Sequence, residues 1–131
     1  VMMLAMTYKT VGRVEEALSM LDKAMRLNPM RPNAYLHEYG TCYRLLGRYD
    51  EAIAVLKGVL ERSPDYLNSR LNLTLTYVMS GKEEAARVEA IEVLKLSPDF
   101  SIGRFLKKFP YKDEKILDSM GNAFRKAGLP D

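Results

Sequence analysis

The stretch that decides the fold is NAYLHEYGTCYRLLGRYDEAIAVLKGVLERSP, residues 33–64. Its first half repeats apolar and small residues at the spacing of one α-helical face, at Leu36, Tyr39, Gly40 and Tyr43. Leu46-Gly47-Arg48 then interrupts the pattern, and a second helical pattern follows. We therefore expect two short amphipathic helices joined by a tight turn. Because neither could bury its apolar face alone, the pair must stack on similar pairs.

Glycine, proline, alanine and tyrosine residues recur at corresponding positions on both sides of this stretch, with a period of 34 or 35 residues. Four kinds of residue hold that period, which indicates an internal repeat. They are the glycines Gly12, Gly47 and Gly81, the prolines Pro29, Pro64 and Pro98, the alanines Ala17, Ala52 and Ala86, and the tyrosines Tyr8, Tyr43 and Tyr77.

These recurring residues have structural roles that their chemistry explains. We expect each glycine to end the first helix of a pair, since a residue without Cβ readily takes the left-handed conformation. We expect each proline to stop the second helix, because it disfavours helix in the residue before it. The alanines are small enough to let the two helices of a pair approach closely.

These marks resemble the tetratricopeptide repeat, a 34-residue helix–turn–helix unit. The resemblance covers residues 1–98 and implies an all-α, right-handed superhelix of three units: 1–29, 33–64 and 67–98. At the position where the family often has Trp, this chain has Val1, Leu36 and Arg70. The third unit also has Thr74 where a small residue is usual.

After Pro98 the period breaks, and residues 99–131 are predicted to form C-terminal capping helices. We expect a short helix over 101–108, a turn over 109–112, and an amphipathic helix over 113–127 that starts at Asp113 as N-cap. The apolar face of the last helix would be Ile116, Leu117, Met120 and Phe124. This tail resembles the one that follows such repeats in some bacterial proteins with a class III adenylate cyclase domain upstream.

Composition sets the broad class of the protein. The net charge of +3 lies entirely in residues 101–131, and Cys42 is the sole cysteine, so no internal disulfide is possible. No run approaches the roughly 18 apolar residues that span a bilayer, and Val1–Met6 lacks the basic flank of a signal peptide. We expect a cytoplasmic protein. Its start at Val, within a helical pattern, suggests a piece of a longer chain.

Candidates for catalysis are few. His37 and Cys42 are five residues apart on one predicted helix, so they point about 140° apart and cannot act as a pair. The acidic pairs, such as Glu83-Glu84, open second helices, where they complement the helix dipole. No phosphate-binding loop or metal-ligand cluster is present in the sequence, so we predict no enzyme activity, no cofactor and no metal.

The resemblance implies a concave groove lined by the first helix of each unit. The groove positions of this chain are Met2, Met6, Lys9, Ala34, His37, Thr41, Arg44, Asn68, Leu71, Leu75 and Val78. The family's best understood groove clamps a terminal carboxylate with Lys and Asn. His37, Thr41, Leu71 and Leu75 stand at those positions here, which argues against binding of chaperone tails.

Three surfaces leave alternatives open. The third-unit groove is apolar, so either the C-terminal helices pack there or a partner's helix does. Met2, Met3, Met6 and Tyr8 form an apolar front end that could drive self-association. Arg104, Lys107, Lys108, Lys112 and Lys115 interleave with Phe105, Phe109 and Tyr111, which could touch nucleic acid or an anionic membrane. Acids among these bases favour a solvated capping helix instead.

The sequence thus predicts a non-catalytic module that binds a peptide or helix of another protein, or of its own parent chain. The alternative is the regulatory C-terminal region of a larger bacterial enzyme, such as an adenylate or guanylate cyclase. Nucleic-acid binding through the basic tail is disfavoured, and the absence of affinity at low salt would exclude it.

Overall fold

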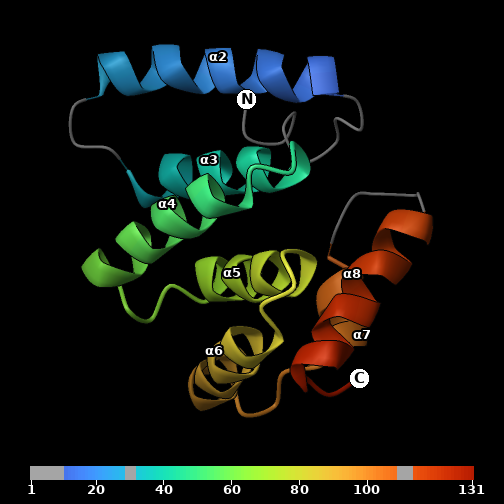
Figure 1. Ribbon diagram of the computed structural model, residues 1–131. Helices are drawn as coiled ribbons and strands as arrows, with labels where there is room; N and C mark the ends of the chain where they lie inside the picture. Colours follow the sequence, from blue (N-terminus) through green and yellow to red (C-terminus); the bar gives the residue numbers. More distant parts are fainter. Residues whose placement is uncertain (1–10, 29–31, 109–113) are drawn as a thin grey trace. The chain divides into compact units, whose positions relative to one another are not determined.

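The computed structural model describes residues 11–28, 32–108 and 114–131, and every regular element in those ranges is an α-helix. The all-α class is therefore confirmed. The chain divides into two compact units that meet between Ser69 and Arg70. The helices are α2 (Val11–Leu27), α3 (Asn33–Leu45), α4 (Tyr49–Arg62), α5 (Leu67–Met79), α6 (Glu83–Leu96), α7 (Ile102–Leu106) and α8 (Glu114–Ala127) (Figure 1).

The turns inside the second and third repeats have the same hydrogen bonds. Gly47 and Gly81 have φ of 78° and 81°, the left-handed conformation that glycine takes without steric cost. Arg48 N–H donates to the Tyr43 carbonyl, and Lys82 N–H donates to the Tyr77 carbonyl, both at 2.8 Å. These bonds close the first helix of each pair, so the prediction for these two glycines is confirmed.

The first repeat differs. Gly12 lies inside α2, one residue after its start at Val11, so the prediction that Gly12 ends a helix is wrong. Glycine in the first turn of a helix costs little, because that turn has few backbone bonds to lose. The regular spacing therefore predicted the position of this glycine in the repeat but not its backbone conformation.

The second helices of the second and third repeats, α4 and α6, end with the same hydrogen bonds. Ser63 N–H donates to the Val59 carbonyl and Ser97 N–H donates to the Val93 carbonyl, both at 2.8 Å. A turn follows each proline, with Tyr66 N–H on Ser63 O and Phe100 N–H on Ser97 O, both at 3.0 Å. The proline stop is thus confirmed for Pro64 and Pro98, and Pro29 lies outside the described residues.

Unit 1 is organised by α2, α3 and α4 (Figure 1). Val14, Ala17 and Leu21 of α2 pack with Cys42 of α3 in one buried cluster. The α3–α4 pair approaches most closely at Gly40, where an added Cβ would lie 2.6 Å from Leu56 Cδ2 and 2.7 Å from Leu56 Cγ. Real Cβ atoms do not approach other atoms this closely, so any larger residue at this position would force Leu56 to shift.

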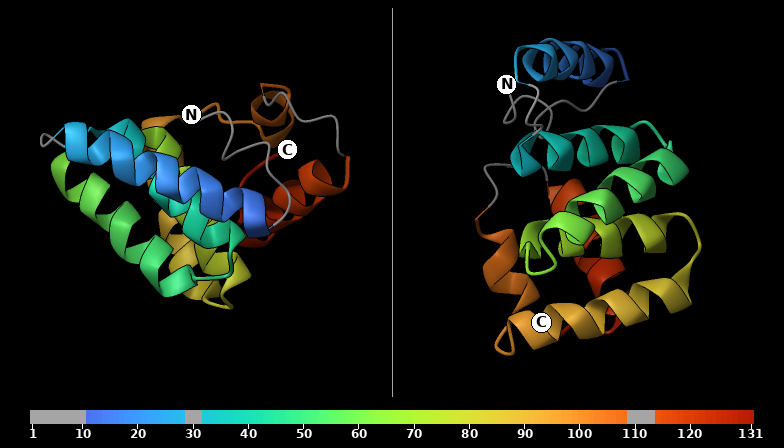
Figure 2. Two further views of the ribbon diagram at one scale, coloured as in Figure 1. Left: turned by 90° about the horizontal axis from the view of Figure 1, so that it is seen from above. Right: turned by 90° about the vertical axis from the view of Figure 1, so that its left-hand side faces the viewer.

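Unit 2 pairs α5 with α6, which run side by side in both Figure 1 and the right-hand view of Figure 2. Seven consecutive residues of α5, from Leu71 to Tyr77, are buried. Two of them are threonines whose hydroxyls bond within the helix: Thr74 donates to Arg70 O and Thr76 to Asn72 O, both at 2.8 Å. Seven consecutive residues span all sides of a helix, so α5 is covered on more than one side.

The C-terminal helices close around three phenylalanines. The rings of Phe100, Phe105 and Phe124 lie with centroids 5.6–6.2 Å apart, and Phe124 is fully buried. Ile102 N–H donates to Pro130 O at 2.9 Å, which ties the chain end to the start of α7. The helix α8 also packs on α6, as a capping element should.

The bounds of the tail helices need a small correction. The helix α7 ends at Leu106 rather than at 108, because Lys107 already serves as its C-cap. Asp113, the predicted N-cap of the last helix, lies outside the described residues, as do Phe109 and Tyr111. Within the described part of the chain, no helix is long and apolar enough to cross a membrane.

Candidate functional site

The groove positions of α3 form a polar cluster in unit 1. His37 Nδ1 lies 3.0 Å from the Ser69 hydroxyl, and its ring lies 6.1 Å from the Tyr66 ring. Burial, and then the charge of Arg44, lowers the pKa of His37 to about 4. The imidazole is therefore neutral at physiological pH. It acts here as a hydrogen-bonding side chain and carries no charge for a partner to recognise.

Ala34, another predicted groove residue of α3, is half-buried, and the remaining two differ in access. Thr41 is 5% exposed, and its hydroxyl donates to the His37 carbonyl at 3.3 Å. Arg44 is half-buried, and its charge reaches His37, Glu38 and Cys42, whose pKa values it lowers. Arg44 is thus the source of positive potential on this helix.

Sequence reasoning missed the buried acid next to His37. Glu38 is 4% exposed, and its Oε2 has no hydrogen-bond partner among the described residues. Burial raises the pKa of this carboxyl to about 7, against the opposing charge of Arg44. The sequence offered no signal for its burial, because an acid in an amphipathic helix is usually exposed.

The thiol of Cys42 is also enclosed. It is fully buried, and burial raises its pKa to about 12, with the Glu38 charge adding to the effect. A thiol with that pKa does not form a thiolate nucleophile at neutral pH. In the described ranges no three side chains of the His, Cys, Asp or Glu type are grouped as metal ligands.

The predicted groove residues of α5 lie in different surroundings. Asn68 is exposed, while Leu71 and Leu75 are 1% and 3% exposed. These two leucines are covered in this structure. Val78 is half-buried and faces an open hollow. Met2, Met6 and Lys9 lie outside the described residues.

That hollow has a volume of about 520 Å³. One wall is the C-terminal end of α5 and the other is one face of α8. The lining residues are Val78, Met79, Asp118, Ser119, Asn122, Ala123 and Lys126. Asp118, Asn122 and Lys126 are spaced by four residues, so they form a row along α8. The hollow therefore joins an apolar wall to a polar row with an acid at one end and a base at the other.

The basic tail presents fewer free groups than its sequence suggests. Arg104 donates to the Asp99 carbonyl and lies 4.0 Å from the Asp99 carboxylate. Phe105 packs in the phenylalanine cluster instead of lying open to solvent as a stacking platform. Lys107 and Lys108 are exposed, and the side chains of Lys112 and Lys115 lie outside the described part.

Comparison with known proteins agrees with the repeat geometry. Two tetratricopeptide-repeat family models match, one over residues 2–67 and the other over residues 43–102. The human protein N-alpha-acetyltransferase 16, NatA auxiliary subunit, is 29% identical over 96 residues, which are 73% of this chain. The chain spans 11% of the length of that relative. A family model that covers half of the chain, together with the repeated helix pairs and turns, shows that the chain belongs to the tetratricopeptide-repeat family.

Proposed function

We propose that this chain is a non-catalytic module that binds a short segment of another protein, or of its own parent chain, in the hollow beside α8. Tetratricopeptide repeats are protein-interaction scaffolds, and the human relative is named as an auxiliary subunit. The observation that carries the proposal is the pairing of two unlike walls in one hollow, the apolar end of α5 and the polar row of α8.

The dimensions of the row define the segment that fits. Asp118 and Lys126 are eight residues apart, which is about 12 Å along a helix. An extended peptide rises about 3.3 Å per residue, so about four residues match the row. The Asn122 amide can donate to and accept from the peptide backbone. A matching segment carries a basic side chain near Asp118, an acidic one near Lys126, and an apolar one against Val78 and Met79.

A peptide library displayed on phage tests the proposal. Selection on the full chain should enrich segments with the basic, apolar, acidic order. Binding of one labelled selected peptide is then measured by fluorescence anisotropy. Lys126→Glu should weaken it about tenfold or more, because an opposite-charge contact becomes a like-charge one, and Met79→Glu should weaken it similarly by breaking the apolar wall.

Lys107→Glu is the matched control, since Lys107 is exposed on the same unit but does not line the hollow. This control makes the same charge change and should leave binding unaltered. Selected peptides that bind Lys126→Glu and Met79→Glu as tightly as the wild type would place the binding surface elsewhere. Groove residues of unit 1, above all His37 and Arg44, are then the next to substitute.

The tail motivates a second candidate function. Its sequence FSIGRFLKKFPYKDEKILDSMGNAFRKAGLP, residues 100–130, resembles the tail of repeat arrays in bacterial proteins with a class III cyclase domain. On that reading the module regulates a catalytic domain in its own parent chain. The gene upstream of Val1 decides this candidate, because it either encodes such a domain or does not.

A further inference from the structure

The outward face of α6 is apolar at its centre. The residues Ala86, Ala90 and Val93 are buried, and the opposite face of the helix carries Glu84, Val88, Ile91 and Lys95. Val88 is 60% exposed and Ile91 is 55% exposed. Two large apolar side chains therefore stand side by side in solvent, with an acid before them and a base after them along the helix.

The same face in the other repeats carries no large apolar residue. In α2 the corresponding residues are Glu15, Ser19, Asp22 and Arg26, and in α4 they are Asp50, Ala54, Lys57 and Glu61. All eight are exposed. The repeat fold therefore does not require apolar residues at these positions. The valine and isoleucine of α6 need a reason specific to the third repeat.

We propose that the outward face of α6 pairs, antiparallel, with α6 of a second copy of this chain. The spacing of four, three and four residues is that of a two-helix seam. In the antiparallel alignment, Val88 lies opposite the second copy's Ile91, and Glu84 lies opposite its Lys95. Twofold symmetry repeats both contacts, so two apolar layers are flanked by two opposite-charge layers.

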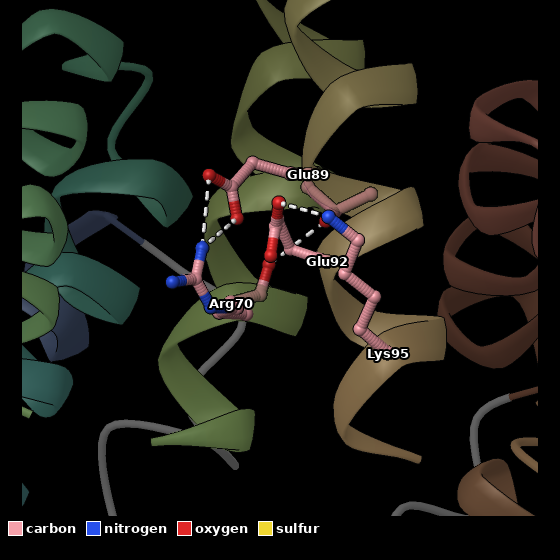
Figure 3. Close-up of polar contacts among 5 residues, drawn as sticks. Arg70, Glu89, Glu92 and Lys95 are labelled. Atoms are coloured by element: carbon pink, nitrogen blue, oxygen red, sulfur yellow. Dashed lines mark hydrogen bonds and ion pairs between the residues drawn. The ribbon is translucent and has the colours of Figure 1, made fainter. Parts of the chain in front are cut away.

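Charge order selects this partner and this direction. A parallel alignment would set Glu84 against a second Glu84 and Lys95 against a second Lys95, which is repulsive. The antiparallel alignment satisfies both ends at once, so the face is complementary to itself. In the single chain, Lys95 bonds Glu92 at 3.2 Å (Figure 3), and this is an exposed pair of little energetic value. Lys95 can exchange it for the second copy's Glu84 at small cost.

The contact is small, so the association is weak and transient. Sedimentation equilibrium of the full 131-residue chain at concentrations up to about 1 mM and low ionic strength detects dissociation constants in that range. The wild type should show a monomer–dimer equilibrium. Val88→Asp should abolish it, because it places two carboxylates in the apolar layers.

Charge exchange identifies the register. Glu84→Lys and Lys95→Glu should each weaken the dimer about tenfold, since each turns two opposite-charge pairs into two like-charge pairs. The double variant Glu84→Lys/Lys95→Glu restores both pairs with reversed signs and should recover wild-type association. Glu61→Lys, on the corresponding face of α4, is the matched control and should change nothing.

Circular dichroism melts establish that each variant is folded. Wild type that stays monomeric at about 1 mM overturns the proposal. Association that survives Val88→Asp overturns it as well, because another surface, such as the N-terminal end, is then responsible. A double charge exchange that fails to restore association shows that something other than a second antiparallel α6 occupies this face.

Discussion

The second and third repeats have the same turn geometry but differ in how the two helices of each pair pack. Both have the left-handed glycine, the same turn hydrogen bonds and a fully buried alanine, Ala52 or Ala86. The second repeat brings its helices together at Gly40 and Leu56. At the corresponding positions, 34 residues later, the third repeat has Thr74 and Ala90, which are both buried. The larger residue has moved from the second helix to the first.

A second exchange accompanies the first. Leu36 and Val55 of the second repeat correspond to Arg70 and Glu89 of the third. Arg70 Nη1 lies 3.1 Å from a Glu89 carboxylate oxygen, and both side chains are 15% exposed (Figure 3). The third repeat therefore has an ion pair where the second repeat has two apolar residues. The lesson is that residues at facing positions of a helix pair change together between these two repeats, in size at one pair of positions and in charge at the other.

The largest expected effect comes from giving the second repeat one half of the third repeat's packing. Gly40→Thr puts a side chain against Leu56 and should lower the free energy of unfolding by about 3 kcal/mol. Leu56→Ala leaves a cavity and should cost about 3 kcal/mol. The double variant reproduces the Thr–Ala pair and should cost about 3 kcal/mol in total, well below the sum.

Urea denaturation of the four proteins gives this double-mutant cycle. Equal urea dependence across the series is the control, because it shows that the unfolding reaction is the same. Effects that simply add would contradict the comparison, since they would mean that Gly40 and Leu56 do not constrain one another.

The second repeat also carries titrating groups where the third has none. His37 and Glu38 correspond to Leu71 and Asn72. The pKa of Glu38 is raised from 4.5 to about 7, so its protonated form favours folding, and stability falls as pH rises through that window. The pKa of His37 is lowered from 6.5 to about 4, so stability rises with pH between those values. Each shift corresponds to about 3 kcal/mol, and the two oppose one another.

Single substitutions should separate these opposing effects. Relative to wild type, His37→Gln should lose stability as pH rises from about 4.5 to 7, because only the Glu38 effect remains. Glu38→Gln should gain stability over about the same range, because only the His37 effect remains. Urea denaturation at a series of pH values measures both profiles. The exposed Glu61→Gln is the control, and identical profiles for His37→Gln and Glu38→Gln would contradict the assignment.

The ion pair of the third repeat gives a smaller effect. Arg70→Ala leaves Glu89 largely buried without that cation and should lower the free energy of unfolding by about 2 kcal/mol. Arg70→Leu with Glu89→Val copies the apolar pair of the second repeat and should lie within about 1 kcal/mol of wild type. Chemical denaturation compares the two. A double variant as unstable as Arg70→Ala would show that the pair cannot be exchanged as a unit.

Sequence period alone predicted the helix pairs, glycine turns and proline stops of the second and third repeats, and the alanines that are buried in all three repeats. It did not predict which residues compensate one another across a pair. Considered alone, Arg70 only departs from the Trp that the family often has at this position. Its partner Glu89 lies 19 residues away on another helix, and only the distance between them shows the pair. The prediction that Gly12 ends a helix was wrong for a related reason. The sequence shows where the glycine is, but the surrounding backbone determines its conformation.

The candidate site was less predictable than the fold. Repeat position predicted Val78 for the groove of the repeats, and Val78 lines the hollow, yet the opposite wall of the hollow comes from α8, which lies outside the repeat. His37 lies on the predicted helix, but its partner Ser69 is 32 residues away on α5, so the sequence pattern could not show this bond. Glu38 was overlooked because an acid in an amphipathic pattern is usually exposed, and burial in this case depends on a neighbouring repeat.

The smallest effect distinguishes two glycines of the same helix pair. Gly58 of α4 has nothing within 4 Å of an added Cβ, whereas Gly40 of α3 has Leu56 at 2.6 Å. Alanine is favoured over glycine inside a helix by about 1 kcal/mol. Gly58→Ala should therefore stabilise the chain by about that amount, while Gly40→Ala should destabilise it, because the clash with Leu56 exceeds the gain in propensity. Thermal and urea melts of the two variants decide the point. If both variants were more stable than wild type, Leu56 would have to move aside freely. Gly40 would then not be needed for the packing of α3 on α4.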